Sequence, residues 1–143
     1  MGLKIDIELL EGGIAPKYQT EGSAGMDLCC SESFELQPLQ RMAVPTGVKI
    51  ALPEGYEAQV RPRSGLALKH GIAMVNAPGT IDSDYRGEIR AILINLGQEV
   101  VRFDKGERVA QLVVAPVTKA EWNPVNELNQ TDRGAGGFGS TGK

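Results

Sequence analysis

The chain has 143 residues and a net charge of −3, from 15 basic and 18 acidic side chains. This length fits one domain able to bury roughly 70% of the surface of its unfolded chain. A mildly acidic chain is not expected to coat nucleic acid directly, because such surfaces are normally basic. With 18 glycines, 8 prolines and little helical periodicity, the composition favours an all-β fold.

We expect a single domain over residues 1–143, with a β core to about residue 122 and a C-terminal extension and arm over residues 123–143. The N-terminal run MGLKIDIELL lacks an apolar stretch long enough for a signal peptide or a membrane helix. The two cysteines, Cys29 and Cys30, are neighbours, so no disulfide within the chain is expected. These features predict a cytoplasmic protein with no membrane partner.

Leu3, Ile5, Ile7 and Leu9 alternate with polar residues, which predicts a strand over residues 3–9 with one wet face. Further strands are predicted over residues 26–30, 43–52, 56–61, 72–75, 88–96 and 108–117. Turn residues separate them at 53–55, 78–80, 96–98 and 104–106. One short helix is predicted over residues 64–70. Short strands at this spacing favour a jelly-roll-like β-sandwich or barrel.

Two polar residues interrupt predicted apolar strands. Asp27 lies in GSAGMDLCC, where a lone acid is costly unless it is paired or helps to hold a cation, such as magnesium through water. Gln111 lies in DKGERVAQLVV, and a buried glutamine needs hydrogen-bond partners. Gln111 therefore holds a ligand or a water, or satisfies the backbone.

The segment RPRSGLALKHG, residues 61–71, places Arg63, Ser64 and Gly65 at the start of the predicted helix. Unpaired N–H groups, a hydroxyl and a guanidinium together suit phosphates. The alternative for Ser64 is an ordinary helix N-cap. A single histidine, His70, with two adjacent cysteines does not build a zinc site of the usual spacing.

Residues 76–88 read NAPGTIDSDYRGE, which predicts a hairpin bending at residues 78–79 that presents donors and acceptors to a ligand. Asp82 is the candidate base, because a carboxylate can orient and deprotonate a water. The alternative is an ordinary surface salt-bridge cluster of the segment's charged side chains, namely Asp82, Asp84, Arg86 and Glu88.

The last residues, 133–143, read RGAGGFGSTGK and contain five glycines. Glycine allows the backbone N–H groups to turn toward an anion. Ser140 and Thr141 add hydroxyl donors, Arg133 a planar fork for phosphate, and Phe138 a face on which a base can stack. The alternative from composition alone is a disordered, solvated terminus.

Taken in order, the segments AGMDL, PRSGLALKHG, NAPGTIDSDYRGE, GERVAQL and RGAGGFGSTG resemble the five motifs of the trimeric deoxyuridine triphosphate nucleotidohydrolases. The resemblance extends over residues 24–142. It implies a β jelly roll, a homotrimer with three active sites at subunit junctions, and a dUTP substrate. The implied reaction is hydrolysis to dUMP and pyrophosphate with Mg²⁺, which limits uracil in DNA and supplies dUMP for dTMP synthesis.

The resemblance also implies a role for each motif residue. Asp82 is the base for the attacking water, and Asp27 holds the metal through water while the substrate phosphates provide most of its ligands. Tyr85 packs against deoxyribose where a 2′-hydroxyl would clash. The uracil reader comprises Asn76 with the backbone of Gly79, Thr80 and Ile81. The phosphate and water-positioning set comprises Arg63, Ser64, Gly65 and Gln111. The closing arm brings Phe138 to the base and, toward the phosphates, Arg133, Gly139, Ser140 and Thr141.

Two other functions remain open from the residues. A dCTP deaminase has a similar fold, but its glutamate-bearing deaminase signature is not evident in this sequence. A non-catalytic nucleotide-binding regulatory module would keep the scaffold without turnover. Ammonia release from dCTP identifies the first, and the absence of pyrophosphate release from dUTP identifies the second.

Overall fold

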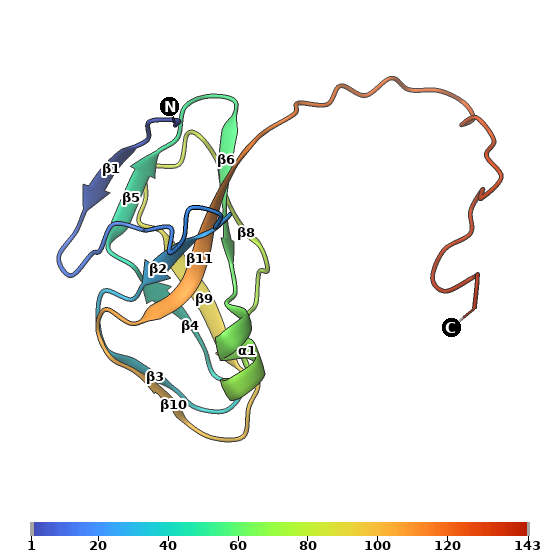
Figure 1. The fold of residues 1–143 in the computed structure, drawn as a ribbon. Coiled ribbons are helices and arrows are strands. Elements are labelled where there is room, and N and C mark those ends of the chain that lie inside the picture. Colours follow the sequence, from blue (N-terminus) through green and yellow to red (C-terminus); the bar gives the residue numbers. More distant parts are fainter. Residues whose placement is uncertain (1, 143) are drawn as a thin grey trace.

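A computed structural model describes residues 2–142, which form a β body with a long C-terminal extension (Figure 1). The predicted domain limits at residues 1 and 143 lie outside the described residues. The helix is α1 (Ser64–His70). The strands are β1 (Asp6–Leu9), β2 (Met26–Cys29), β3 (Phe34–Leu36), β4 (Arg41–Pro45), β5 (Val48–Ala51), β6 (Tyr56–Arg61), β7 (Ile72–Met74), β8 (Gly79–Ile81), β9 (Arg90–Asn95), β10 (Val101–Phe103) and β11 (Arg108–Pro116).

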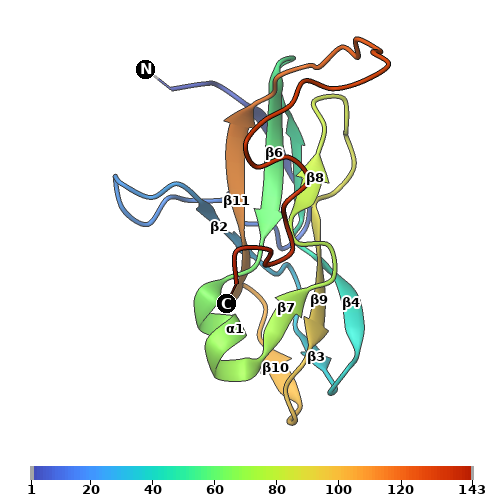
Figure 2. The ribbon, with the colours of Figure 1, turned by 90° about the vertical axis from the view of Figure 1, so that its right-hand side faces the viewer.

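The strands form a four-stranded sheet in the order β2-β11-β6-β8 and a three-stranded sheet in the order β4-β9-β7 (Figure 2). Two ribbons, β1-β5 and β10-β3, complete the body. Successive strand residues point to opposite faces, so alternate apolar side chains can enter one core. Leu28, Val44, Ile72, Leu93 and Leu112 are among those buried there. The predicted all-β, jelly-roll-like sandwich with one short helix is confirmed.

Local sequence signals placed some elements well and others poorly. β6 and α1 have the predicted bounds, whereas the strand predicted over residues 43–52 is two strands, β4 and β5. The chain turns between them at Thr46 and Gly47, and Gly47 has a φ of 67° that favours glycine. The predicted strand over residues 3–9 is β1, beginning only at Asp6, and both faces of β1 are exposed.

The hairpin predicted over residues 76–88 is wrong. β7 pairs with β9 and β8 pairs with β6, so the chain crosses here from one sheet to the other. The bend lies at residues 75–78, and Gly79 already belongs to β8. The crossing brings the loop after β7 and the end of β8 to the same edge of the body.

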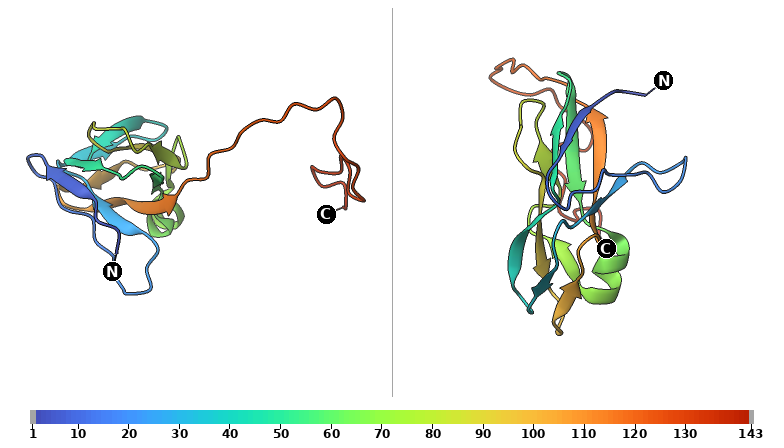
Figure 3. Two further views of the ribbon diagram at one scale, coloured as in Figure 1. Left: turned by 90° about the horizontal axis from the view of Figure 1, so that it is seen from above. Right: turned by 90° about the vertical axis from the view of Figure 1, so that its left-hand side faces the viewer.

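The C-terminal extension leaves the body directly after β11. Val117 donates its N–H to the carbonyl of Gly55 at 2.8 Å. Beyond it, the chain stands away from both sheets, as the view from above also shows (Figure 3). Over residues 2–142, no helix has the length and apolar character needed to cross a membrane.

Candidate active site

Asp27 is paired, as its position in a largely apolar strand requires. Its side chain is 14% exposed, and Arg63 Nε lies 3.6 Å from Oδ1 while Arg108 Nη1 lies 3.4 Å from Oδ2. The three residues, which we call the Asp27 cluster, come from β2, from the residue before α1 and from β11. The cluster places a carboxylate between two cations beside the start of the helix.

Gln111 lies next to Asp27 and Arg61 in the registers of β11 with β2 and β6. Its amide Nε2 donates to the carbonyl of Pro62 at 2.9 Å. A Cβ placed on Gly25 would lie 2.5 Å from Gln111 Oε1, so Gly25 leaves the room that this amide occupies. Gln111 therefore fixes the segment that enters α1 and keeps its oxygen beside the Asp27 cluster.

The N-cap reading of Ser64 is wrong, because the helix begins at Ser64 itself. The N-cap residue is Arg63, with φ −100° and ψ 131°, and it makes no side-chain capping hydrogen bond within the described chain. A Cβ on Gly65 would meet open space. The first turn of α1 is thus free of internal caps and carries no acidic side chain among the described residues.

The predicted uracil readers lie together at the crossing between the sheets. A cavity of about 470 Å³ is lined by residues that include Asn76, Gly79, Thr80, Ile81 and Tyr85, together with Val60 and Glu88. The Asn76 amide Nδ2 lies 3.3 Å from the point where a Cβ of Gly79 would be, so it packs on the strand backbone. The cavity combines amide, peptide and aromatic groups, as recognition of a base edge requires.

Asp82 follows this cavity directly and lines a neighbouring hollow of about 780 Å³. The surface salt-bridge cluster considered for this segment is not formed. Glu88 pairs with Arg90 at 3.0 Å, and Arg86 donates to the carbonyls of Ser83 and Tyr85. Among residues 2–142, Asp82 takes part in no ion pair.

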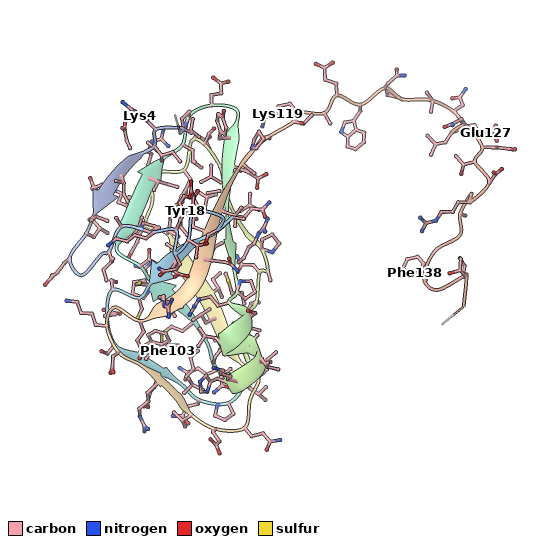
Figure 4. The ribbon with its side chains drawn as sticks, in the orientation of Figure 1. Lys4, Tyr18, Phe103, Lys119, Glu127 and Phe138 are labelled. Atoms are coloured by element: carbon pink, nitrogen blue, oxygen red, sulfur yellow. The ribbon has the colours of Figure 1, made fainter. Side chains whose placement is uncertain are left out.

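The arm residues lie apart from both groups. Arg133 Nε donates to the carbonyl of Gly136 at 2.7 Å, and Ser140 N–H donates to Gly137 O at 3.0 Å. Phe138 is fully exposed and lies on the arm, well apart from the body (Figure 4). A single chain therefore presents three separate groups: the Asp27 cluster with Gln111, the cavity with Asp82, and the arm. Phosphate contacts by Gly139 and Thr141 remain predictions.

Sequence reasoning missed two residues of the first group, Arg108 and Gly25. Arg108 stands in the quoted GERVAQL segment, but its contact with Asp27 depends on the pairing of β11 with β2, which shifts register between residues 108 and 110. Cys29, also beside the cluster, is a free thiol, as is Cys30. Burial raises the pKa of the Cys29 thiol, the charge of Asp27 raises it further, and Arg108 opposes both.

A family model of the dUTPases matches residues 11–142 of the chain. The chain belongs to the dUTPase family. The deoxyuridine 5′-triphosphate nucleotidohydrolase of Wolinella succinogenes is 58% identical over 98% of this chain and 96% of its own length. That of Zymomonas mobilis is 55% identical over 99% of both. The family predicted from the five motifs is confirmed, and with it the enzyme class, dUTP diphosphatase.

Solved dUTPase structures share the fold. The dUTPase of Staphylococcus bacteriophage 80alpha with dUPNHPP has a TM-score of 0.91 and 27% identity, covering 98% of this chain and 99% of its own. A dUTPase mutant from phage phi11 of S. aureus, with coordination of a structural Mg(II) ion, has a TM-score of 0.81 at 23% identity, covering 87% and 98%. The second similarity extends only to the fold.

Proposed function

We propose that the protein hydrolyses dUTP to dUMP and pyrophosphate at a site that three copies of the chain assemble. The observation that carries this proposal is the separation of the three groups. The arm that bears Arg133 and Phe138 stands off its own body (Figures 1 and 4). Residues that must meet around one nucleotide are supplied most simply by neighbouring subunits, and a homotrimer gives three equivalent sites.

Exposed apolar surface supports self-association. A groove of about 550 Å³, which we call the apolar groove, is lined by residues including Leu3, Ile5, Ile7, Tyr18, Val114 and Pro116. The extension also exposes Trp122, Val125 and Leu128. Burying each such side chain contributes about 1.5–3 kcal/mol, so a monomer would leave much stabilisation unused.

The proposed chemistry uses one residue from each group. Asp82 orients and deprotonates a water for in-line attack on the α-phosphorus. Gln111 positions that water and the phosphates, and Arg133 places a guanidinium against the charge that develops on the leaving pyrophosphate. Arg63, Ser64 and Gly65 hold the triphosphate at the uncapped first turn of α1.

The cavity accounts for substrate choice. Uracil presents an N3–H between two carbonyl oxygens, whereas cytosine reverses two of these three features. A site matched to one edge by Asn76 and the backbone of residues 79–81 can reject the other by up to about 10⁴- to 10⁵-fold. Tyr85 packs against the deoxyribose where a 2′-hydroxyl would collide.

The donor set fits magnesium held chiefly by the substrate. Among the described residues, no group of three or more His, Cys, Asp or Glu side chains is placed to hold a metal ion. Mg²⁺ typically keeps several waters and uses one or two carboxylates with substrate phosphates. Asp27 would contact such a hydrated ion, and the ion would neutralise phosphate charge. The free thiols fit a reducing, cytoplasmic location.

A substrate panel tests the proposal. Purified protein is incubated with dUTP, dCTP, dTTP or UTP, with and without Mg²⁺, and both pyrophosphate and ammonia are measured. We expect pyrophosphate from dUTP alone among the four, and only with the metal. Ammonia from dCTP would identify a deaminase, and no product from any nucleotide would identify a regulatory module.

A further inference from the structure

The Tyr85 ring lies directly on the backbone of the residues that follow it. Its hydroxyl donates to the carbonyl of Glu88 at 2.9 Å. A Cβ placed on Gly87 would lie 2.6 Å from the ring carbon Cζ and 3.0 Å from Cε1. Because an aromatic ring cannot bend away, the ring occupies this position only while residue 87 has no side chain.

Glu88 is itself fixed from outside the loop. Its side chain is 16% exposed; Oε2 accepts the N–H of Gly47 at 2.9 Å, and Oε1 lies 3.0 Å from Arg90 Nη2. The N–H of Ile89 donates to the carbonyl of Val48 at 2.8 Å. The carbonyl that receives the Tyr85 hydroxyl therefore belongs to a segment tied to the turn between β4 and β5.

That turn reaches into the core. Thr46 is fully buried; its hydroxyl donates to the carbonyl of Ile89 and accepts the N–H of Val48 at 3.3 Å. Ile89 is also buried. A buried polar network with all its partners holds its geometry firmly. The Tyr85 hydroxyl is thus bonded to a fixed point, although 45% of the residue remains exposed.

We infer that Gly87 and Glu88 are positioning residues for sugar selection. The inference rests on the proposed function, in which the Tyr85 ring blocks a 2′-hydroxyl. An exposed tyrosine has two rotatable side-chain bonds and would otherwise swing aside to admit ribose. Gly87 leaves open the space in which the Tyr85 ring lies. The Glu88 carboxylate accepts the Gly47 N–H and so keeps in place the Glu88 carbonyl that accepts the Tyr85 hydroxyl. Glu88 also lines the cavity and Gly87 does not, so the variants are judged by the dUTP-to-UTP ratio rather than by activity alone.

Gly87→Ala tests whether the open space at residue 87 sets the position of the Tyr85 ring. The new methyl group displaces the ring, so the ratio of kcat/KM for dUTP to that for UTP is expected to fall by about tenfold or more. The matched control is Gly22→Ala, because a Cβ at Gly22 meets open space. This control is expected to keep the wild-type ratio. Melting temperature is measured for both variants to separate displacement of the ring from unfolding.

Variants of Glu88 test the hydrogen bond to Gly47 that fixes the accepting carbonyl. They also provide a test of the inference if Gly87→Ala does not fold. Glu88→Ala removes the acceptor for Gly47 N–H and is expected to lower the dUTP-to-UTP ratio by about 3- to 10-fold. Glu88→Gln keeps an acceptor oxygen and is expected to restore the ratio. Arg102→Ala, which removes an ion pair with Glu35 on an exposed side chain outside the cavity, is the control and is expected to leave it unchanged.

The outcomes separate this inference from the proposed function. If the wild-type protein releases no pyrophosphate from dUTP, the proposed function fails. If the wild type prefers dUTP over UTP, while folded Gly87→Ala and Glu88→Ala keep that preference and lose only thermal stability, the positioning role is overturned. Loss of preference in both variants, with rescue by Glu88→Gln, supports it.

Discussion

The loop between β8 and β9 and the C-terminal arm both supply residues to the proposed site, but they are built in opposite ways. The loop ends in Glu88, which is bonded to Gly47, and in buried Ile89. The described hydrogen bonds of the arm join residues three apart, such as Gly142 N–H to Gly139 O at 2.9 Å, and Phe138 is fully exposed. One part is preorganised by the core, and the other must be ordered by the ligand.

Because of this difference, the two regions are expected to contribute to catalysis in different ways. Groups held by the core can be aimed at the reacting atoms without further loss of entropy. A glycine-rich arm loses conformational entropy each time it closes, so its contacts must offset about 1 kcal/mol or more per ordered residue. Changes in the loop should therefore alter turnover, and changes in the arm should also alter apparent affinity.

The largest effect is expected for Asp82→Asn. Without the carboxylate, the water is no longer deprotonated, and kcat should fall by about 10²- to 10⁴-fold with little change in KM. Steady-state pyrophosphate release measures both constants. Asp84→Asn, in the same hollow, is the control and should keep wild-type turnover. Near-normal turnover in Asp82→Asn would remove Asp82 from its role as base.

Removing the arm comes next. Deletion of residues 133–143 loses base stacking worth roughly 1–3 kcal/mol together with the phosphate contacts, so kcat/KM should fall by about 10²- to 10³-fold. Phe138→Ala isolates the stacking, at about 5- to 150-fold, and Phe138→Trp should retain it. A deleted chain that hydrolyses dUTP at the full rate would show that the arm is a solvated terminus.

Elements marked by residues within or beside them were predicted well from the sequence, whereas very short strands and the pairing of distant strands were not. α1 and β6 were predicted to the residue, because Pro62 precedes the helix and Gly71 ends it with a φ of 68°. β3 and β10 were missed, because each shows a single apolar–polar–apolar step, which is too short a pattern to distinguish a strand from a loop. The hairpin error has another cause: no local pattern records that β7 and β8 pair into different sheets.

The site shows the same limit. Motif order predicts Asp82, Tyr85 and Gln111 as site residues, because the family resemblance assigns each of them a role. The roles of Arg108, Gly47 and Gly87 depend on contacts across the fold, with Arg108 reaching 81 residues back to Asp27. A linear sequence also does not state that the arm and the cavity of one chain stand apart.

The proposed trimer gives a further test, because in it each preorganised half-site is completed by the arm of a neighbouring subunit. Ile7→Lys places a charge in the apolar groove, where desolvation is costly, and should raise the dissociation constant of the trimer by about tenfold or more. Analytical ultracentrifugation measures it, and activity should fall with it. Leu39→Lys, at an exposed leucine outside the groove, is the control. An unchanged mass at every concentration would contradict the proposed surface.

The smallest expected effect concerns Cys29. The reactivity of its thiol reports the charges around Asp27, and so tests whether they stay the same when the arm is removed. Burial and Asp27 raise its pKa, so less thiolate exists at a given pH than in an exposed cysteine. Asp27→Asn removes one raising cause and leaves Arg63 and Arg108 in place. The pKa should move down, and iodoacetamide labelling of Cys29 near pH 8 should quicken by about two- to fivefold.

Peptide mass spectrometry follows both thiols, with Cys30 as the internal reference because it is fully buried. Deleting residues 133–143 should leave the labelling rate of Cys29 at the wild-type value, since Asp27, Arg63 and Arg108 all belong to the body. Faster labelling after deletion would mean that the arm covers or charges this cluster before any nucleotide binds. The division between a preorganised body and a ligand-ordered arm would then be wrong at the Asp27 cluster.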